Sequence, residues 1–521
     1  MISSPQPSAT DEIRRSLTSF PIDLLKIYPR SFCSKKGLQY GLIRTSEGKK
    51  LFVMGTKENV LRDGFRGNFH HQSSSLKLCD LSAENTECLM DLFPYTKPIS
   101  LRGYSVTVGI GDLLGLAIPG HIRAIKKFQV HPVLAQQSVN ENTATGRNFT
   151  QRIQDAVWAV FQENYQEGYG AGGDPLKSLQ EVKEALDGGV SMVTLNPAGK
   201  MSSKPFQGSK GWIDRRFKEE IDEGDAQVIF HLFLDKEFVL EGPKGQSAIC
   251  FDEESVKRNT LFFYKAMDFI EEVYQLIRSK TGNRPLIDFE ISMEEAPFPT
   301  SPENHFFFAL ELSHRGVHIQ SLAPRFIGEF QKGMDDRKER ETFRRQFYQH
   351  TLIAQDYGNY KISIQSESNR LPVLSETGGL SNGSLHLKTT GTSWLEAMRL
   401  VALRNPSLYR EIHRYALSLF KEASKRYPVT TDFNQITNLQ ELHNQELPCL
   451  LDQEESGKLL NIPNGFVINA KDEDGKNLFG DPLYHTLMQY EEEYWSLLEK
   501  HIENHLNSYG IKKKTDRKGD P

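Results

Sequence analysis

The run SVTVGIGD, residues 105–112, decides the fold because seven further runs share its design. Each run consists mainly of apolar or small residues and ends in a polar or charged residue. Most of the runs are separated by stretches with helical spacing, as expected for strands that are packed in a barrel and covered by helices. The seven further runs are 132–136 (PVLAQ), 169–174 (YGAGGD), 191–196 (SMVTLN), 286–290 (LIDFE), 318–325 (HIQSLAPR), 360–365 (YKISIQ) and 384–388 (SLHLK). Together the runs predict an α/β fold, a TIM (β/α)8-type barrel.

The chain has 521 residues, which is more than the roughly 250 residues of a typical barrel. We therefore predict extensions on both sides of a barrel over residues 101–400. Residues 1–100 are expected to form a small β-containing module with a hairpin over 38–55, and residues 401–510 a helical extension. An insertion at about 200–255 is expected beside the barrel mouth, where it could act as a lid. Residues 511–521 have no apolar anchor, so a disordered tail is expected.

The composition excludes several kinds of partner. The chain has 63 Lys and Arg residues against 68 Asp and Glu residues, a formal charge of −5. Because this balance leaves no basic surplus, we expect neither a nucleic acid nor a membrane partner, and we expect a small-molecule substrate. The five cysteines have no CxxC spacing, and the N-terminus lacks the basic and apolar regions of a secretory signal. The prediction is a cytoplasmic protein.

The polar residues that end the eight runs are the candidate functional residues. In TIM barrels the chemistry lies at the carboxyl ends of the strands, so these side chains are expected to meet in one mouth. The alternative is that each is simply the first residue of a loop, but eight in succession favour a shared site. They are Asp112, Gln136, Asp174, Asn196, Glu290, Arg325, Gln365 and Lys388.

Asp174 and Glu290 are the predicted catalytic pair, because they end the third and fifth runs and could face each other across the mouth. Two carboxyl groups on opposite sides of a bound carbon can remove a proton from one face and return it to the other. A carbon acid beside a ketone usually also needs a divalent metal cation to hold the developing enolate oxygen. The best candidate metal ligand is His386, with Gln365 and His350 as weaker candidates.

His386 could instead be a hydrogen-bonded core residue, which is the more common role of a lone histidine in an apolar strand. The alternation Leu385, His386, Leu387, Lys388 places the histidine and the lysine on one face of the strand. In a barrel one of the two faces is the lumen. Positive charge from Arg325 and Lys388, with Gln136 and Asp112 nearby, is expected to bind a substrate that carries a carboxylate or a phosphate.

Several segments resemble the tagaturonate epimerases of bacterial hexuronate catabolism, and the resemblance covers roughly residues 100–500. The segments include GIGDLLGLAIPGHIRAIKK, NYQEGYGAGGDPLK, SPENHFFFALELSHRGV and SLHLKTTGTSWLEAMRLVA. The resemblance implies a metal-dependent epimerase with a TIM barrel that interconverts tagaturonate and fructuronate, with inversion beside the ketone by proton abstraction and return. It also implies Asp174 as proton acceptor, Glu290 as proton donor and His386 near the metal.

The chain departs from the family pattern at two positions where that pattern has histidines, which here are Pro175 and Gln365. Proline cannot ligate a metal, and an amide oxygen holds transition metals more weakly than an imidazole. Glu367 adds a carboxylate nearby. Two alternatives therefore stand beside the epimerase: a metal-dependent aldolase or isomerase that acts on a related keto-sugar acid, and a non-catalytic barrel that binds a sugar acid.

Overall fold

The structure is a computed structural model of the whole chain. It describes residues 22–70, 73–243, 245–281, 287–326, 337–365, 383–389, 391–423 and 439–514, together with Ile13, Arg15, Leu17 and Ser381. Glu367 and residues 515–521 of the expected tail lie outside the described residues. The chain divides into two compact units, residues 1–98 with 151–168 and residues 99–150 with 169–521.

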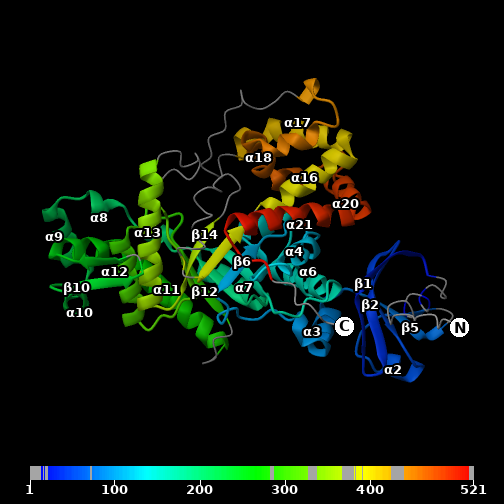
Figure 1. Ribbon diagram of the computed structural model, residues 1–521, viewed down its shortest axis with the longest axis horizontal. Coiled ribbons are helices and arrows are strands. Elements are labelled where there is room, and N and C mark those ends of the chain that lie inside the picture. Colours follow the sequence, from blue (N-terminus) through cyan, green and yellow to red (C-terminus); the bar gives the residue numbers. More distant parts are fainter. Residues whose placement is uncertain are drawn as a thin grey trace. The chain divides into compact units, whose positions relative to one another are not determined.

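The second unit is built on a closed barrel of parallel strands, in the order β12-β13-β14-β15-β6-β7-β8-β9 (Figure 1). This arrangement confirms the predicted TIM-type fold, and every strand overlaps one of the eight predicted runs. The largest difference is at the sixth run, where only three residues pair as a strand. The strands are β6 (Val106–Ile110), β7 (His131–Gln137), β8 (Gly170–Leu176), β9 (Met192–Leu195), β12 (Asp288–Ser292), β13 (Ser321–Ala323), β14 (Lys361–Gln365) and β15 (Leu385–Thr389).

Helices cover the outside of the barrel, and their ends are marked by the sequence. Helix α7 begins with a capping box between Ser178 and Glu181, and α12 begins with a similar box between Ser301 and Asn304. Helix α11 buries one face rich in Phe, Ile and Val and packs against α7 and α12. The helices of this unit that follow strands are α4 (Ile118–Ile125), α5 (Val139–Thr145), α7 (Leu179–Asp187), α11 (Glu253–Thr281), α12 (Pro302–His314), α13 (Arg337–Tyr357) and α16 (Thr392–Arg404), while α6 (Phe149–Gln162) belongs mostly to the first unit.

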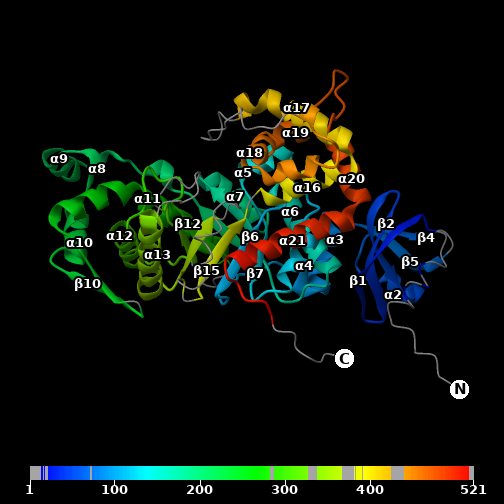
Figure 2. The ribbon, with the colours of Figure 1, turned by 45° about the horizontal axis from the view of Figure 1, so that its top comes forward.

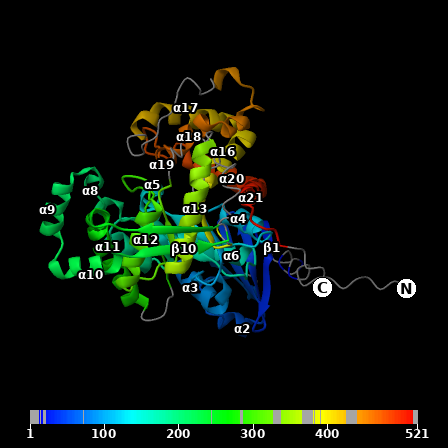
Figure 3. The ribbon, with the colours of Figure 1, turned by 60° about the vertical axis from the view of Figure 1, so that its left-hand side comes forward.

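The connection between β9 and β12 contains the insertion, which comes before α11. It holds η2 (Ala198–Lys200), α8 (Lys204–Gln207), α9 (Lys210–Glu220), α10 (Glu223–Phe233) and the hairpin β10 (Glu237–Gly242) and β11 (Gly245–Cys250). Figure 3 shows α8, α9 and α10 grouped together, away from the C-terminal helices α17–α20. Helix α9 packs against α11, so the insertion is anchored on the helix that returns the chain to the barrel.

Helices C-terminal to the barrel belong to the same unit (Figure 2). The last of them, α21, packs along α4. Its Trp495 Nε1 donates to the carbonyl of Leu116 at 2.8 Å, and Tyr494 donates to the carbonyl of Ser393 at 2.8 Å, so α21 holds the loop after β6 and the first turn of α16. The elements after α16 are α17 (Pro406–Ala423), η6 (Leu439–Glu441), η7 (Leu447–Asp452), α18 (Glu454–Asn461), α19 (Asn464–Ile468), α20 (Gly480–Gln489) and α21 (Glu491–Ser508).

The first unit is a five-stranded antiparallel sheet in the order β1-β2-β3-β5-β4, and β2 with β3 forms the predicted hairpin. Most of α6 joins this unit, where Trp158 Nε1 donates to Thr86 at 2.8 Å. No helix in the described part of the chain is long and apolar enough to cross a membrane. The elements of this unit are β1 (Leu24–Lys35), β2 (Leu38–Thr45), β3 (Gly48–Met54), α2 (Lys57–Leu61), β4 (Asn68–His70), β5 (Ser73–Asp80), α3 (Ala83–Leu92) and η1 (Pro94–Thr96).

Candidate active site

The candidate site is a cluster of carboxylates around the ammonium of Lys388, at the carboxyl end of β15. Lys388 Nζ donates to Glu294 Oε2 at 2.9 Å. It lies 3.3 Å from Glu290 Oε1 and 3.8 Å from Asp174 Oδ2. Lys388 is 2% exposed and Glu290 is fully buried. Although burial disfavours the ammonium, the three carboxylates hold the pKa of Lys388 well above its ordinary value, so the cluster contains a permanent buried cation.

Asp174 is positioned by Gln136, whose Nε2 donates to Asp174 Oδ2 at 2.7 Å. Room for this amide comes from Gly109 on the neighbouring strand β6, where a Cβ atom would lie 1.2 Å from Gln136 Oε1. Burial raises the pKa of Asp174 to about 7, while Lys388 opposes this effect and Glu290 adds to it. Asp174 can therefore hold or release a proton near neutral pH, as a general acid or base must.

Glu290 lies between two strands that each supply a hydroxyl donor. Thr194 on β9 donates to Oε1 at 3.2 Å, and Ser321 on β13 donates to Oε2 at 2.5 Å. Both residues are the register partners of Glu290 in the barrel. Burial would raise the pKa of Glu290, but Lys388, His386 and the Ser321 hydroxyl together lower it. Two neighbouring carboxyl groups with pKa values moved in opposite directions are typical of acid-base pairs.

His386 lies on the lumen face of β15, which is the face it shares with Lys388, as the alternation in the sequence predicts. Its Nδ1 is 2.8 Å from Thr107 Oγ1, and Thr107 also accepts from Lys361 Nζ at 3.3 Å. Its Nε2 is buried and has no hydrogen-bond partner among the described residues. Burial lowers the pKa of His386 to about 4, so the ring is neutral. His386 is thus both a hydrogen-bonded core residue and a residue with one free nitrogen toward the lumen.

The sequence matches the tagaturonate epimerase family over residues 28–509. A tagaturonate/fructuronate epimerase from Thermotoga maritima is 34% identical over 482 residues, which are 92% of this chain and 96% of that protein. A crystal structure of the fructuronate-tagaturonate epimerase of Cohnella laeviribosi with glycerol has 39% identity and a TM-score of 0.87, covering 96% of this chain and 99% of that one. Its native crystal structure has 38% identity and the same TM-score and coverage.

This chain belongs to the tagaturonate epimerase family. It is therefore an enzyme of the isomerase class, as the resemblance in its sequence implies.

Within the described part of the chain, the donor atoms do not fit a divalent metal site. Among the described residues, no three His, Cys, Asp or Glu side chains are arranged to hold an ion. Gln365 lies beside Glu294, and since an amide oxygen would be repelled there, its NH2 group faces the carboxylate at 3.2 and 3.3 Å. The amide oxygen then points away from the acidic cluster, and the centre of that cluster holds the Lys388 ammonium.

His350 does not join the cluster among the contacts that the structure records. It lies on α13, where its Nδ1 is 2.8 Å from His305 Nδ1 and its ring packs on Phe326. Both histidines are buried between α12 and α13, and burial lowers the pKa of His350 to about 3. The prediction of His350 as a weak metal ligand therefore finds no support in this geometry.

Asp112 has a different task from the predicted binding of substrate. Its two carboxylate oxygens accept four backbone amide protons, from Gly115 and Ala117 at 2.8 Å and from Leu116 and Ile118 at 3.2 Å. These bonds shape the loop after β6 and the start of α4. Because the oxygens are already committed to the backbone, Asp112 supports the mouth structurally.

Replacing Asp112 by alanine is expected to destabilise the protein by about 3 kcal/mol, because buried amides lose their acceptors. Urea unfolding followed by tryptophan fluorescence measures this change. An exposed carboxylate elsewhere at the mouth, Glu295, serves as the control, and Glu295→Ala should cost less than about 0.5 kcal/mol. Equal effects of the two substitutions would contradict the assigned role.

Arg325 follows β13 and is half-buried. Its Nη1 donates to the carbonyl of Ala296, and its backbone carbonyl accepts from Thr300 at 2.7 Å. Arg325 thus braces the loop between β12 and α12, which also carries Glu294. It remains the predicted residue for a substrate anion at the rim of the mouth.

Two charged residues of the site escaped the sequence analysis. Glu294 lies two residues beyond the end of β12, so the rule of strand-ending polar residues selected Glu290 alone. Lys361 lies at the start of β14, where burial lowers its pKa to about 8. The sequence did contain a sign of this residue, because a lysine within a mainly apolar strand is expected to be buried with polar or charged partners.

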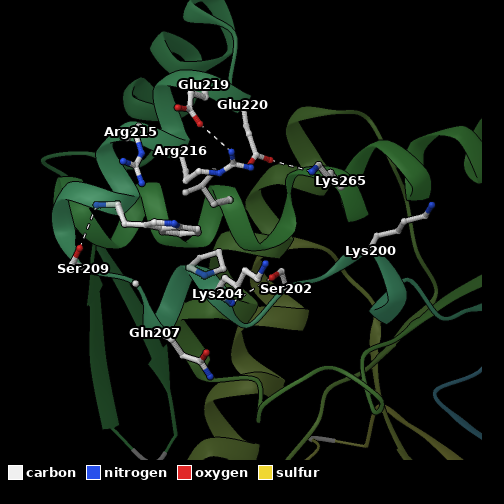
Figure 4. Close-up of a pocket in the computed structure, with 14 residues that line it drawn as sticks. Lys200, Ser202, Lys204, Gln207, Ser209, Arg215, Arg216, Glu219, Glu220 and Lys265 are labelled. Atoms are coloured by element: carbon white, nitrogen blue, oxygen red, sulfur yellow. Dashed lines mark hydrogen bonds and ion pairs between the residues drawn. The ribbon is translucent and has the colours of Figure 1, made fainter.

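A cavity of about 890 Å³ lies in the insertion, away from the carboxylate cluster. Its walls come from η2, α8, α9 and α11, and none of the cluster residues lines it. Figure 4 shows Arg216 turned toward Glu219 and Glu220, and Lys265 paired with Glu220 at 3.1 Å. These ion pairs neutralise part of the positive charge that lines the cavity. The buried carboxylate cluster, which has groups able to transfer a proton, fits an epimerase better than this cavity does.

Gly109→Ala tests how Asp174 is positioned. The new methyl group would displace the Gln136 amide and remove a hydrogen bond that favours ionised Asp174. We expect kcat to fall about 10-fold to 100-fold and the pH midpoint of activity to move upward. Gly199→Ala is the control, since nothing lies within 4 Å of a Cβ there. An unchanged pH midpoint would show that Gln136 does not act through Asp174.

Proposed function

We propose that this enzyme interconverts tagaturonate and fructuronate. The observation that carries the proposal is the buried pair Asp174 and Glu290, which come from β8 and β12 and both face the Lys388 ammonium. Relatives at 34% and 39% identity, covering most of the chain, are named as epimerases of these two keto-uronates. Arg325 at the rim is proposed to bind the substrate carboxylate.

The chemistry of the two sugar acids sets what the site must do. With the ketone at C2, tagaturonate and fructuronate share their configuration at C3 and C5 and differ at C4. The predicted proton abstraction beside the ketone acts at C3, so by itself it leaves C4 unchanged. Interconversion of the two acids therefore needs a step that inverts the configuration at C4.

Breaking and remaking the C3–C4 bond provides that step. A base removes the proton of the C4 hydroxyl, C4 becomes an aldehyde, and the C3–C4 electron pair moves into an enediolate over C2 and C3. The aldehyde turns, the enediolate attacks its opposite face, and the proton returns to the C4 oxygen. Nothing is oxidised or reduced overall. Asp174 is proposed as the group that takes and returns this proton, because its pKa of about 7 suits both directions.

The enediolate also explains why two carboxylates of different character are useful. Ionised Glu290, fixed by Thr194 and Ser321, keeps the Lys388 ammonium in place without competing for the proton of Asp174. An aldolase that acts on a related keto-sugar acid uses the same enediolate chemistry and would release its fragments.

A non-catalytic barrel that binds a sugar acid is the second candidate. Pro175 and the inward NH2 group of Gln365 favour it, because neither residue can ligate a metal in this arrangement. Such a protein would bind tagaturonate without converting it, and Asp174→Asn would leave its affinity almost unchanged.

The test is a proton NMR assay of purified protein with tagaturonate in ²H₂O, with Asp174→Asn as the control. The proposal expects fructuronate to form without deuterium at C3, since bond cleavage keeps the C3 and C4 hydrogens in place. Deuterium at C3 would contradict bond cleavage, and free aldehyde would indicate an aldolase. Binding by calorimetry without turnover would support the non-catalytic barrel and overturn the proposed function.

A further inference from the structure

The positive charge at the centre of the acidic cluster is the ammonium group of Lys388, a side chain of the protein itself. Lys388 Nζ has three carboxylate neighbours within 3.8 Å. They are Asp174 on β8, Glu290 on β12 and Glu294 in the loop after β12. Carboxylate oxygens are the ligands that a hard divalent ion prefers, but with Lys388 present these three groups are not arranged to hold one. Here the charge is delivered by a side chain with 2% exposure.

From this arrangement we infer that the enzyme works without a resident divalent metal, because the Lys388 ammonium supplies the positive charge that the reaction needs. The claim that Lys388 supplies charge to the reaction rests on the proposed function. The claim that a divalent ion is excluded from the cluster rests on geometry alone.

An ion placed among the three carboxylates would meet the ammonium at short range. Two like charges in a buried site repel strongly, and the lysine cannot leave because its side chain is packed in the barrel. Lys388 pairs in register with Gly109 on β6, and the space above that glycine is filled by Gln136. The surrounding side chains therefore hold the ammonium over the lumen.

The remaining donors that the structure describes do not offer a second place for the ion. Gln365 directs its NH2 group toward Glu294, and Pro175 has no donor atom. His386 contributes one free nitrogen, Nε2, while its Nδ1 is held by Thr107. A single imidazole with no further ligand among the described residues is too few for a stable site.

The ammonium can do the work of a metal on the substrate. As the C3–C4 bond breaks, negative charge develops on the ketone oxygen at C2. Lys388 donates a hydrogen bond to that oxygen and stabilises the enediolate, and the bond weakens again when the ketone is restored. The proton of the C4 hydroxyl moves separately, to Asp174 and back, so that atoms and charges balance without any added ion.

The experiment compares metal binding by wild type and Lys388→Met. Metal content is measured by mass spectrometry on protein purified without chelator or nickel resin, and Mn²⁺ affinity by electron paramagnetic resonance. Wild type is expected to carry less than about 0.1 equivalent of metal and to keep its activity in EDTA. Lys388→Met vacates the centre of three carboxylates, so it should bind Mn²⁺ at least about 10-fold more tightly than wild type and lose about 1,000-fold in kcat.

Lys361→Met is the matched control, because it removes another buried lysine whose recorded hydrogen bond goes to Thr107. It should not gain Mn²⁺ affinity. About one equivalent of metal in wild type, removed by chelator together with activity and restored by a divalent ion, would overturn the inference. These wild-type measurements decide the question even if Lys388→Met fails to fold. If wild type converts no tagaturonate under any condition, the proposed function fails, while the Mn²⁺ comparison still tests the exclusion of metal.

Discussion

Asp174→Asn is expected to lower kcat about 1,000-fold while the protein stays folded, because an amide cannot accept the proton of the C4 hydroxyl. The substitution keeps the shape of the side chain and an oxygen that can accept from Gln136 Nε2. KM should change little, since Asp174 is assigned to proton transfer. Initial rates with tagaturonate and circular dichroism measure the two effects. Glu295→Gln, at an exposed carboxylate in the loop after β12, is the control and should keep full activity.

The pH dependence of the wild type follows from the same residue. Since Asp174 must be ionised to accept the proton, kcat should rise with pH through about 7 and then level off. The free energy of unfolding is expected to change with pH in the opposite direction to kcat. Burial raises the pKa of folded Asp174 above its unfolded value, so the folded state binds the proton more tightly, and that stability is lost as pH rises through about 7. Asp174→Asn should therefore lose less stability than wild type between pH 4 and 8, as melting temperatures would report.

A flat pH profile between 6 and 8 would contradict the assignment of Asp174, and so would an Asn variant with more than a tenth of wild-type kcat. A loss of both kcat and pH dependence in Glu295→Gln would show that the loop, and not the proton acceptor, controls the rate.

The barrel strands were predictable because each strand buried in a barrel is a compact apolar run with a polar end, and that pattern survives in the sequence. Alternation along β15 placed His386 and Lys388 on one face of the strand, and the structure shows that this face is the lumen. The rule that polar residues end the strands selected Asp174 and Glu290, and in the structure both carboxylates lie near the Lys388 ammonium.

The parts that could not be predicted depend on contacts between distant segments. Nothing near Asp112 in the sequence distinguishes a substrate ligand from an acceptor for four backbone amides, because the difference is made by how the chain turns after β6. Glu294 joins the cluster from the loop after β12, through its contact with Lys388 on the distant strand β15. His350 lies on α13 with its ring next to His305 of α12, and the spacing of residues in the sequence does not predict this contact.

Glu290→Ala is expected to have the largest combined effect, with loss of at least about 1,000-fold in kcat and about 3 kcal/mol in the free energy of unfolding. Glu290 is fully buried, and its removal leaves the Lys388 ammonium and the hydroxyls of Thr194 and Ser321 without this partner. Breaking a buried pair from one side costs more than the pair contributes, since the remaining charge stays out of water.

Glu290→Gln separates the two effects. Its amide fits the same space and keeps an acceptor for one hydroxyl, but it removes the negative charge that fixes the ammonium. We expect most of the stability to return and the activity to stay low, as urea unfolding and the NMR assay would show. Recovery of activity in Glu290→Gln would mean that the carboxylate is needed only for packing. Activity lost in both variants, with stability lost mainly in Glu290→Ala, requires that the charge on Glu290 itself serves the reaction, because the amide has the same shape without it.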